Sequence, residues 1–410
     1  MPQKNILVIG GGVVGLSTAY YCLQRGHQVT VLDRGSPEDE NCSYGNAGLI
    51  VPSHFVPLAA PGMVKLGLKW MLKPDSPFYI KPRLDGDLIS WGWRFYRAAT
   101  REHVRRSAPL LRDLNLATSR CFDEFAKAHG NTFDLEKRGC FCLCKTQERL
   151  DHEGEIVEHA RELGLKADVL DAKQTAAMEP NVRMEIVGSV FFHEDSHITP
   201  GKFMAALKRV VGAHVCWNTT VTGWKASDSC IQSVQTIQGD FSADEVVLCA
   251  GSWSSTLFKL PLQAGKGYSL TLPEPPQLPR IPMILTEARV AVTPMGGKLR
   301  FGGTMEIAGL NEDLNPIRVQ GIVRSVPKYF PDFAAKDFKG IQPWRGLRPC
   351  SPDGLPYIGR TARFENLSIG TGHAMMGLSL GPITGKLLAQ ILSGEKPEID
   401  LRLVAPDRYV

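Results

Sequence analysis

Residues 5–33 read NILVIGGGVVGLSTAYYCLQRGHQVTVLD, and this stretch decides the fold of the N-terminal part of the chain. The apolar run 6–9 is typical of a short, fully buried strand. A glycine-rich turn follows directly. Residues 14–25 then have the composition of a helix that ends at Gly26, a common C-terminal cap. A second β-rich run covers 27–32, so the order of elements predicts a parallel α/β unit.

The glycines of the turn fit a binding site for a dinucleotide. Gly10, Gly12 and Gly15 form a Gly-x-Gly-x-x-Gly motif. In this motif the glycines allow a tight turn, a close approach of the backbone to a pyrophosphate, and close packing of helix on strand. The helix N-terminus at Val13 and Val14 offers free N–H groups and positive potential to phosphates. The alternative is a glycine-rich turn in an ordinary parallel sheet.

An acidic residue ends the second predicted strand. Asp33 lies 18 residues after Gly15, where a carboxylate can accept hydrogen bonds from a ribose, and Arg34 follows it. Because an acid disfavours a 2′-phosphate, the motif favours FAD or NAD over NADP. The motif alone does not distinguish FAD from NAD.

Composition excludes several classes of protein. The chain has 410 residues, of which 43% are hydrophobic and 22% charged, as in soluble globular proteins and unlike disordered, collagen-like or coiled-coil chains. The net charge of +5 comes from basic residues scattered among 42 acidic ones, so we expect no nucleic acid partner. The ten cysteines are too sparse for a disulfide scaffold, which favours a reducing, cytoplasmic compartment.

A second glycine-rich passage lies near the other end of the chain. Residues 366–389 read NLSIGTGHAMMGLSLGPITGKLLA. We predict a strand over 366–369, a flexible turn, and a helix over 381–391 with Pro382 in its first turn, where proline is tolerated. The binding of NAD does not require a second glycine-rich passage of this kind. Such a passage can instead place backbone N–H groups and a helix N-terminus beside a flavin ring.

Several collinear segments resemble a known family. They are VIGGGVVGLSTAY (8–20), SYGNAGLIVPS (43–53), VVLCAGSWS (246–254), KGYSL (266–270), GLRPCSPDGLPYIG (346–359) and the closing passage. The chain resembles the D-amino-acid oxidase superfamily of FAD-dependent enzymes, which includes glycine oxidase and sarcosine oxidase. Within this superfamily it is most similar to the bacterial D-amino-acid dehydrogenases. The resemblance spans almost the whole chain.

The resemblance implies an α/β fold of two interleaved domains. A Rossmann-like FAD-binding domain would comprise 1–54, 146–260 and 336–410, and a substrate domain on a mixed or antiparallel sheet would comprise 55–145 and 261–335. The residue pattern itself predicts further helices and a sheet region. The predicted helices cover 108–129, 147–163 and the run from a Thr199–Pro200 cap to about Val211, and the predicted sheet covers 281–305.

The resemblance also implies which residues hold FAD besides those of the opening motif. They are Ser43, Asn46, Ala47, Gly48 and Leu49 beside the flavin, Ala250 and Gly251, and Gly372, His373, Met376, Gly377 and Leu378 around its pyrimidine edge. Sarcosine oxidases link FAD through a cysteine in the general region of Cys350. We expect non-covalent FAD in this chain.

Three residues are candidates for substrate binding. Arg348 in GLRP matches the family position that holds the substrate carboxylate, and a guanidinium binds a carboxylate through two parallel hydrogen bonds. Its alternative role is a structural ion pair. Tyr268 could donate to the same carboxylate, with Lys266 on the same face of a strand, or both could be ordinary sheet residues. His54 follows the flavin loop and could face the substrate or pack elsewhere.

Two further patterns can be interpreted either as ordinary structure or as a functional site. His193, Glu194, Asp195 and His197 have the chemistry of metal ligands but lack a fixed ligand face, so we expect no metal site. Residues 61–80 mix Trp, Leu, Met and Phe with lysines. They fit either a helix packed within the substrate domain or a segment at a membrane surface. The resembling dehydrogenases are peripheral enzymes of the inner membrane face that pass electrons to the respiratory chain.

The resemblance implies oxidative deamination of D-amino acids, with hydride transfer from Cα to flavin N5 and electrons passed to a quinone or another acceptor. The alternatives are the same chemistry on a cyclic or N-methylated amino acid, such as a proline derivative, sarcosine or glycine, or a non-catalytic FAD subunit of an electron-transfer complex. An NAD-binding protein is the remaining alternative. The choice of oxygen or another acceptor and the oligomeric state stay open.

Overall fold

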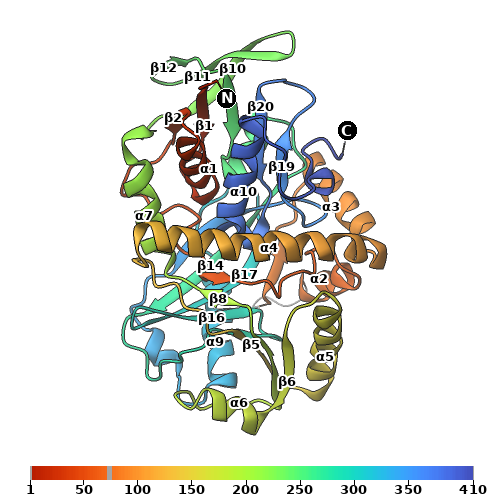
Figure 1. Cartoon of the computed structure of the whole chain (residues 1–410). Coiled ribbons are helices and arrows are strands. Elements are labelled where there is room, and N and C mark those ends of the chain that lie inside the picture. The colour runs from red at the N-terminus through yellow and green to blue at the C-terminus, as the bar shows by residue number, and fades with distance from the viewer. Residues whose placement is uncertain (1, 72–75, 410) are drawn as a thin grey trace.

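The opening stretch of sequence forms the centre of a six-stranded sheet (Figure 1). The structure is a computed structural model that describes residues 2–71 and 76–409. β1 (Asn5–Ile9), α1 (Val13–Gln24) and β2 (Gln28–Leu32) confirm the predicted parallel unit. The strand order is β19-β20-β13-β1-β2-β9, with only β19 antiparallel to its neighbour. The other strands are β9 (Val215–Cys216), β13 (Glu245–Leu248), β19 (Tyr357–Arg360) and β20 (Leu367–Thr371).

Helices cover one face of this sheet, and a small second sheet covers the other. α1 packs on α10 (Gly377–Leu392), and their close approach requires glycine, because a Cβ at Gly385 would lie 2.5 Å from backbone atoms of Ser17 and Thr18. α4 (Arg101–His129) and α7 (Pro200–Val211) complete this layer. The small sheet comprises β10 (Val221–Ser227), β11 (Cys230–Thr236) and β12 (Gly239–Phe241).

The closing helix begins earlier than predicted. α10 starts at Gly377 rather than Gly381, so Pro382 lies inside the helix and not in its first turn. Leu378 and Leu380 are each 1% exposed, and burying these two side chains extends the helix by four residues against the local preference of proline. Ala374–Leu392 is long and apolar enough to span a membrane, but 72% of it is buried inside the protein, as in a core helix.

A larger mixed sheet forms the second half of the molecule. Its strand order is β18-β14-β17-β16-β15-β5-β7-β6, and β4 pairs with the end of β17. One face packs on α9 (Pro316–Tyr329) through an apolar core. The strands are β4 (Phe78–Ile80), β5 (Cys140–Cys144), β6 (Ala167–Asp171), β7 (Gly188–Phe192), β14 (Gln263–Leu272), β15 (Met283–Leu285), β16 (Val290–Met295), β17 (Lys298–Ile307) and β18 (Trp344–Cys350).

This sheet corrects the predicted domain boundaries. The segment 146–260 is predicted to belong to the FAD-binding domain, but its strand β7 pairs with β5 and its strand β6 pairs with β7, so both extend the substrate sheet. The segment 336–410 has the same predicted assignment, but its strand β18 pairs with β14 of the substrate sheet. Hydrogen bonding between strands distant in sequence assigns these segments to the substrate sheet. Because no local change in composition marks the boundaries, the sequence does not reveal them. The predicted sheet at 281–305 is confirmed.

The predicted helices are confirmed with two differences. α4 begins at Arg101 rather than at residue 108, because Thr100 accepts a hydrogen bond from the backbone of His103 and caps the helix. α7 begins at Pro200 as predicted, but the Thr199 side chain donates to Asp134 and does not cap it. The remaining elements are α2 (Met63–Met71), α3 (Gly86–Ala98), α5 (Gln147–Glu162), α6 (Ala172–Met178), α8 (Ser254–Leu257), β3 (Leu49–Ile50) and β8 (Ser196–His197).

Candidate active site

The turn between β1 and α1 has the backbone of a phosphate site. Gly10 has φ +109°, and a Cβ there would lie 2.4 Å from the carbonyl oxygen of Cys249. A Cβ at Gly15 would lie 1.8 Å from the carbonyl oxygen of Gly10. At Gly12 the nearest atom to a Cβ would be Ser43 Oγ at 3.8 Å, so open space adjoins the first turn of α1. That turn has no acidic residue, and its N–H groups therefore fit a pyrophosphate.

The carboxyl end of β2 carries Asp33 beside this turn. Its two carboxylate oxygens accept hydrogen bonds from the backbone N–H groups of Gly11 and Gly35. The carboxylate is half-buried, so it is held in place while one side stays open to water. This position suits contact with the ribose of the dinucleotide, as the spacing of the sequence motif predicts.

Arg34, the next residue, lies on an aromatic surface. Its guanidinium carbon is 3.6 Å from the ring centroid of Trp253. Trp253 follows Ala250 and Gly251, which form the turn after β13, and Gly251 has φ +56°. The carboxyl ends of the neighbouring strands β1, β2 and β13 therefore bring these predicted cofactor residues to one edge of the sheet.

The loop 43–48 connects the phosphate site to the substrate sheet. Ser43 Oγ accepts a hydrogen bond of 3.1 Å from the backbone of Val13, in the first turn of α1. Arg300 on β17 donates from Nη1 to the carbonyl oxygens of Tyr44, at 2.7 Å, and of Asn46, at 2.8 Å. Burial lowers the pKa of Arg300 to about 10, so it is still charged near neutral pH. The guanidinium thus fastens the loop to one face of the sheet.

Small residues bring the rest of this loop close to its neighbours. Gly48 has φ +75°, and a Cβ there would lie 2.3 Å from the carbonyl oxygen of Ile198. Ala47 lies 3.7 Å from the position of a Cβ on Gly302, a residue of β17. Leu49 then pairs with His197 in the short sheet of β3 and β8. The loop therefore lies flat against the sheet.

The closing passage meets the loop from the other side. Asn46 Nδ2 donates to the carbonyl oxygen of Met375, at 3.3 Å. His373 itself turns inward: its ring bonds Thr384 Oγ1 at 2.9 Å, and burial lowers its pKa to about 3. Only backbone atoms of His373 can therefore face the cofactor. Gly372, Met376, Gly377 and Leu378 lie in the same turn and the start of α10.

Arg348 lies over the same face of the substrate sheet. A Cβ on Gly267 would lie 2.2 Å from the guanidinium carbon of Arg348, so the side chain occupies the space that any other residue at 267 would fill. Arg348 donates from Nη1 to the carbonyl oxygen of Thr304 at 2.7 Å. Thr304 has φ +64°, in the register shift of β14 against β17. The surface beneath the guanidinium, called here the Gly267 floor, is thus formed by Gly267 and by the β-bulge at Thr304.

The charge of Arg348 has no partner in this position. Among the residues that the structure describes, its guanidinium forms no ion pair, and it donates a hydrogen bond to the backbone carbonyl of Thr304. Burial lowers the pKa of Arg348, and the Cys42 and Cys350 thiols act against this effect. An arginine remains protonated nonetheless. A half-buried cation without an acid is costly, so an anionic ligand would stabilise it. The predicted alternative of a structural ion pair is wrong.

Tyr268 does not share this site, and its predicted role is wrong. It is 1% exposed and donates from its hydroxyl to Glu306 at 2.6 Å, in the core beneath α9. Lys266 is buried on the same side, where its Nζ donates to Asn311 Oδ1 at 2.8 Å. Alternate residues of a strand face opposite ways, so Gly267 faces Arg348 while its two neighbours face away.

His54 belongs to a buried polar cluster beyond the flavin loop. Its Nδ1 lies 3.2 Å from Ser53 Oγ, which donates to Asp195 Oδ2 at 2.6 Å. Burial lowers the pKa of His54 to about 4, helped by the charge of Arg289, and burial raises the pKa of Asp195 to about 7. His54 is therefore a neutral group at neutral pH and a weak base. Whether it contacts the substrate stays a prediction.

Trp344 is a site residue that the sequence did not single out. Its indole occupies the positions where a Cβ on Gly346 or on Gly45 would lie, at 2.1 and 1.9 Å from ring atoms. Gly346 pairs with Gly267 across β18 and β14, so the indole lies next to the Arg348 guanidinium. The motif W-x-G-L-R contains this aromatic residue, and Gly346 within the motif is the local signal that could have identified it.

The four predicted metal-type residues point to different partners. His193 contacts Asp168 at 2.7 Å, Glu194 accepts from the backbone of Lys166, and Asp195 binds Ser53. His197 is buried beneath the loop. Within residues 2–71 and 76–409, no group of three or more potential ligands is placed to hold a metal ion.

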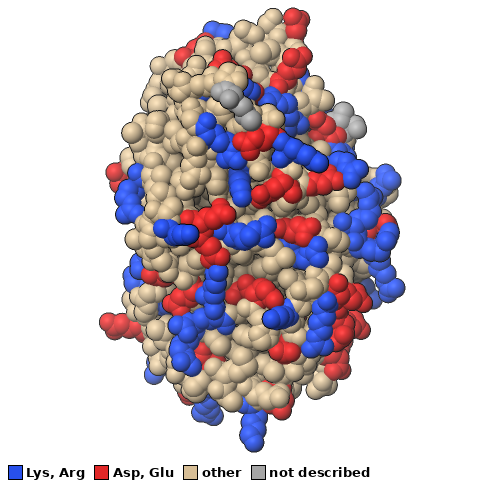
Figure 2. Space-filling view, in the orientation of Figure 1, with Lys and Arg blue, Asp and Glu red and all other residues tan. Residues whose placement is uncertain are grey.

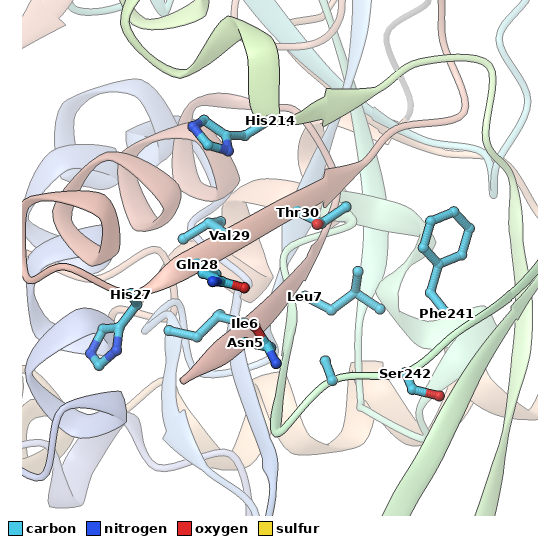
Figure 3. Close-up of a pocket in the computed structure, with 11 residues that line it drawn as sticks. Asn5, Ile6, Leu7, His27, Gln28, Val29, Thr30, His214, Phe241 and Ser242 are labelled. Atoms are coloured by element: carbon cyan, nitrogen blue, oxygen red, sulfur yellow. The ribbon is translucent and has the colours of Figure 1, made fainter. Parts of the chain in front are cut away.

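A groove of about 450 Å³ lies at the other end of the six-stranded sheet (Figure 3). It is lined at the start of β1 and β2 by residues that include Asn5, His27 and Gln28, with Phe241 on the far side. Cofactors of parallel sheets bind outside the carboxyl ends of the strands, whereas this groove lies at the amino ends. It is therefore distinct from the site described above.

Comparison with known proteins agrees with this geometry. A family model described as "FAD dependent oxidoreductase" (DAO) matches residues 5–391. The chain is 32% identical to D-amino acid dehydrogenase of Granulibacter bethesdensis and 33% identical to that of Methylobacterium nodulans, over 99% of each chain. Glycine oxidase of Geobacillus kaustophilus has a similar fold, with a TM-score of 0.79 over the full length of both chains at 20% identity.

The chain therefore belongs to the DAO family of FAD-dependent oxidoreductases, and FAD is its cofactor. The residues present fit this cofactor, because the glycine turn, Asp33 and the loop 43–48 leave the space and the donors that FAD requires. The predicted fold class and family are confirmed. The individual contacts to FAD stay predictions.

Proposed function

We propose that this protein oxidises D-amino acids to imino acids, which hydrolyse in water to 2-oxo acids and ammonia. One observation carries the proposal: on the sheet face that holds the flavin loop, the Arg348 cation has no acidic partner among the residues that the structure describes. A carboxylate is the ligand that fits a guanidinium fork with free donors. The curated relatives named D-amino acid dehydrogenase support the choice of substrate class.

The chain's own residues bind and orient the substrate. The substrate carboxylate would bind the free nitrogens of Arg348, while the Thr304 carbonyl and the Gly267 floor hold the guanidinium in place. The indole of Trp344 would exclude water from one side. Bound FAD supplies the acceptor for the hydride that leaves Cα. The positive charge of Arg348 would lower the pKa of the substrate ammonium, which favours the neutral amine that oxidation requires.

A substrate panel tests this function. Purified protein is assayed with D-, L- and cyclic amino acids and with sarcosine, with oxygen and a quinone compared as acceptors. We propose that linear D-amino acids give the highest kcat/KM and that a quinone reoxidises the flavin faster than oxygen. A preference for cyclic or N-methylated substrates would favour the alternative chemistry. Failure of every amino acid to reduce the flavin would favour an electron-transfer subunit.

We also propose that FAD is bound without a covalent link. Cys350 is fully buried in an apolar cluster with Trp91 and Met305, and its Sγ packs against Gly265. Burial raises the pKa of its thiol to about 12, so the reactive thiolate is scarce at neutral pH. Acid precipitation should leave a yellow supernatant and a colourless pellet. A yellow pellet would show a covalent flavin and contradict this prediction.

We propose that the outer face of α3 contacts the inner surface of the cell membrane. Ile89, Trp93 and Tyr96 are each at least 60% exposed and lie on one side of the helix, at spacings of four and three residues. Figure 2 shows Lys and Arg gathered at the right-hand margin, at the level of the start of α4, while both signs mix over the rest of this face. Exposed aromatic residues beside cations suit anionic lipid headgroups.

The cysteines support a cytoplasmic location. All ten are free, as expected in a reducing compartment. The segment 61–80, for which the sequence allows a membrane contact, adds only part of its length to the membrane surface proposed at α3. Its helix α2 carries Leu68, which is 62% exposed, and residues 72–75 lie outside the described residues.

Trp93→Glu should weaken binding to vesicles that contain anionic lipid by about 10-fold, because it removes an aromatic contact and adds a repelled charge. Co-sedimentation measures the bound fraction. Ile237→Glu is the matched control, since Ile237 is 67% exposed in the turn between β11 and β12, on another part of the molecule. Equal binding of both variants and the unaltered protein would refute the membrane contact.

A further inference from the structure

The inner face of α3 carries a tryptophan that contacts the substrate strand β18. Trp91 is 4% exposed, whereas Ile89 and Trp93 on the same helix are 65% and 61% exposed. The indole Nε1 of Trp91 donates to the carbonyl oxygen of Cys350 at 2.9 Å. Cys350 is the last residue of β18 and lies two residues after Arg348. A buried hydrogen bond thus joins the helix to the strand that carries the proposed carboxylate site.

Apolar side chains surround this hydrogen bond. The Trp91 ring packs in a cluster that contains Met305, Cys350 and Ala374. It also stacks on Phe95, with ring centroids 5.2 Å apart. A hydrogen bond in apolar surroundings is stronger than one in water, so its geometry is more restrictive. The indole therefore fixes the backbone of Cys350 relative to α3.

A second contact joins the α3 region to the same pair of strands. Gln263 of β14 pairs with Cys350 of β18. Arg83, which lies just before α3, donates from Nη2 to Gln263 Oε1 at 2.6 Å. Arg83 also donates from Nε to Asp85, whose side chain caps the helix. Both members of this strand pair are therefore held by side chains of segment 83–91.

Cys350 also connects the substrate sheet to the closing passage. Its backbone forms an isolated antiparallel bridge with His373. His373 begins the turn that is predicted to lie at the pyrimidine edge of the flavin, and Ala374 in this turn has φ +49°. Cys350 is thus the residue at which the strand of Arg348 meets the flavin turn. A displacement of its backbone would move these two parts of the site relative to each other.

We propose that Trp91 is a positioning residue for the oxidation step. Its hydrogen bond to Cys350 determines how Arg348, and with it a bound substrate, lies relative to the flavin. Rates fall steeply when reacting groups are displaced by about 1 Å. Carboxylate binding should be less sensitive, because the Gly267 floor and the Thr304 carbonyl hold the guanidinium independently of α3. This inference rests on the proposed function and adds to it a residue that does not touch the substrate.

Trp91→Phe in the holoenzyme separates the hydrogen bond from the aromatic packing, because phenylalanine keeps a ring but has no N–H donor. In anaerobic stopped-flow mixing with the D-amino acid that is turned over fastest, the rate constant of flavin reduction should fall about 10-fold. Butyrate is a carboxylate without an amine, and its Kd, measured from the flavin absorbance, should stay within about 3-fold of that of the unaltered protein. An unchanged rate constant, or a loss of butyrate affinity as large as the loss of rate, would overturn the positioning role.

Phe95→Leu is the matched control for this substitution. It removes the ring that stacks on Trp91 and leaves the hydrogen bond to Cys350 in place. Both variants should lower Tm by a few degrees, because both reduce packing in one cluster. Only Trp91→Phe should slow flavin reduction. Equal rate constants in the two variants would show a role in packing alone and would overturn the inference.

Visible circular dichroism of the bound flavin supplies a readout that needs no turnover. Saturating butyrate should change this spectrum less in Trp91→Phe than in the unaltered protein, because the carboxylate then lies differently relative to the flavin. Phe95→Leu should give the full change, and a full change in Trp91→Phe would contradict the inference. If no D-amino acid reduced the flavin of the unaltered protein, the proposed function would be wrong, and the butyrate spectra would decide the role of Trp91.

Discussion

Arg348→Ala should lower kcat/KM for D-amino acids by about 10²–10³-fold, because truncation of one partner of a buried charge pair costs about 2–5 kcal/mol. The variant removes the guanidinium that lies over the Gly267 floor. FAD should stay bound, since its predicted contacts lie on other segments. Steady-state kinetics and the ratio of flavin to protein absorbance measure the two quantities separately. Arg348→Lys should recover part of the activity, because a lysine keeps the charge but loses the planar fork.

Arg345→Ala is the matched control for this substitution. Arg345 lies three residues earlier on β18 and pairs with Tyr268, so it faces away from Arg348, with Glu312 at 3.9 Å. Its loss should change kcat/KM by less than about 3-fold, as for an exposed ion pair. If Arg348→Ala turned over D-amino acids as fast as Arg345→Ala, the assignment of the carboxylate site would be wrong.

Gly15→Ala should yield protein without FAD. A Cβ at this position would lie 1.8 Å from the carbonyl oxygen of Gly10, which cannot retreat, because Gly10 itself packs against Cys249. The helix α1 must then move off the strand, and we expect the affinity for FAD to fall at least about 100-fold. Flavin fluorescence titration of the apoprotein measures this affinity.

Gly12→Ala separates an effect on the cofactor from an effect on folding. The nearest atom to a Cβ at Gly12 is 3.8 Å away, so alanine fits the protein itself and should leave the apoprotein's Tm within a few degrees. The methyl group would instead occupy the space beside the first turn of α1. A Gly12→Ala protein that held FAD as tightly as the unaltered protein would contradict the assignment of the pyrophosphate.

The opening motif could be predicted because its signals are local. Gly10, Gly15 and Asp33 occur within one βαβ unit, and each has a conformational or hydrogen-bonding reason to be there. The closing helix was placed four residues late, because the burial of Leu378 outweighs the preference of Pro382 for a first turn. Local preferences are weak where tertiary packing decides.

The substrate site was harder to predict because it depends on pairing between distant strands. Tyr268 and Gly267 are neighbours in the sequence, but the side of the sheet that each faces follows from the register of β14 with β18. The same pairing moves β18 out of the predicted FAD-binding segment.

Anaerobic reduction of the bound flavin tests the central claim most directly. The holoenzyme is mixed in a stopped-flow instrument with the D-amino acid that the substrate panel shows to be turned over fastest, with its Cα-deuterated form, and with the L-enantiomer. The flavin absorbance should bleach in a single phase, several-fold more slowly with deuterium, and stay unchanged with the L-enantiomer. Flavin that stays oxidised with the D-amino acid, or that the L-enantiomer reduces equally fast, would contradict the proposed function.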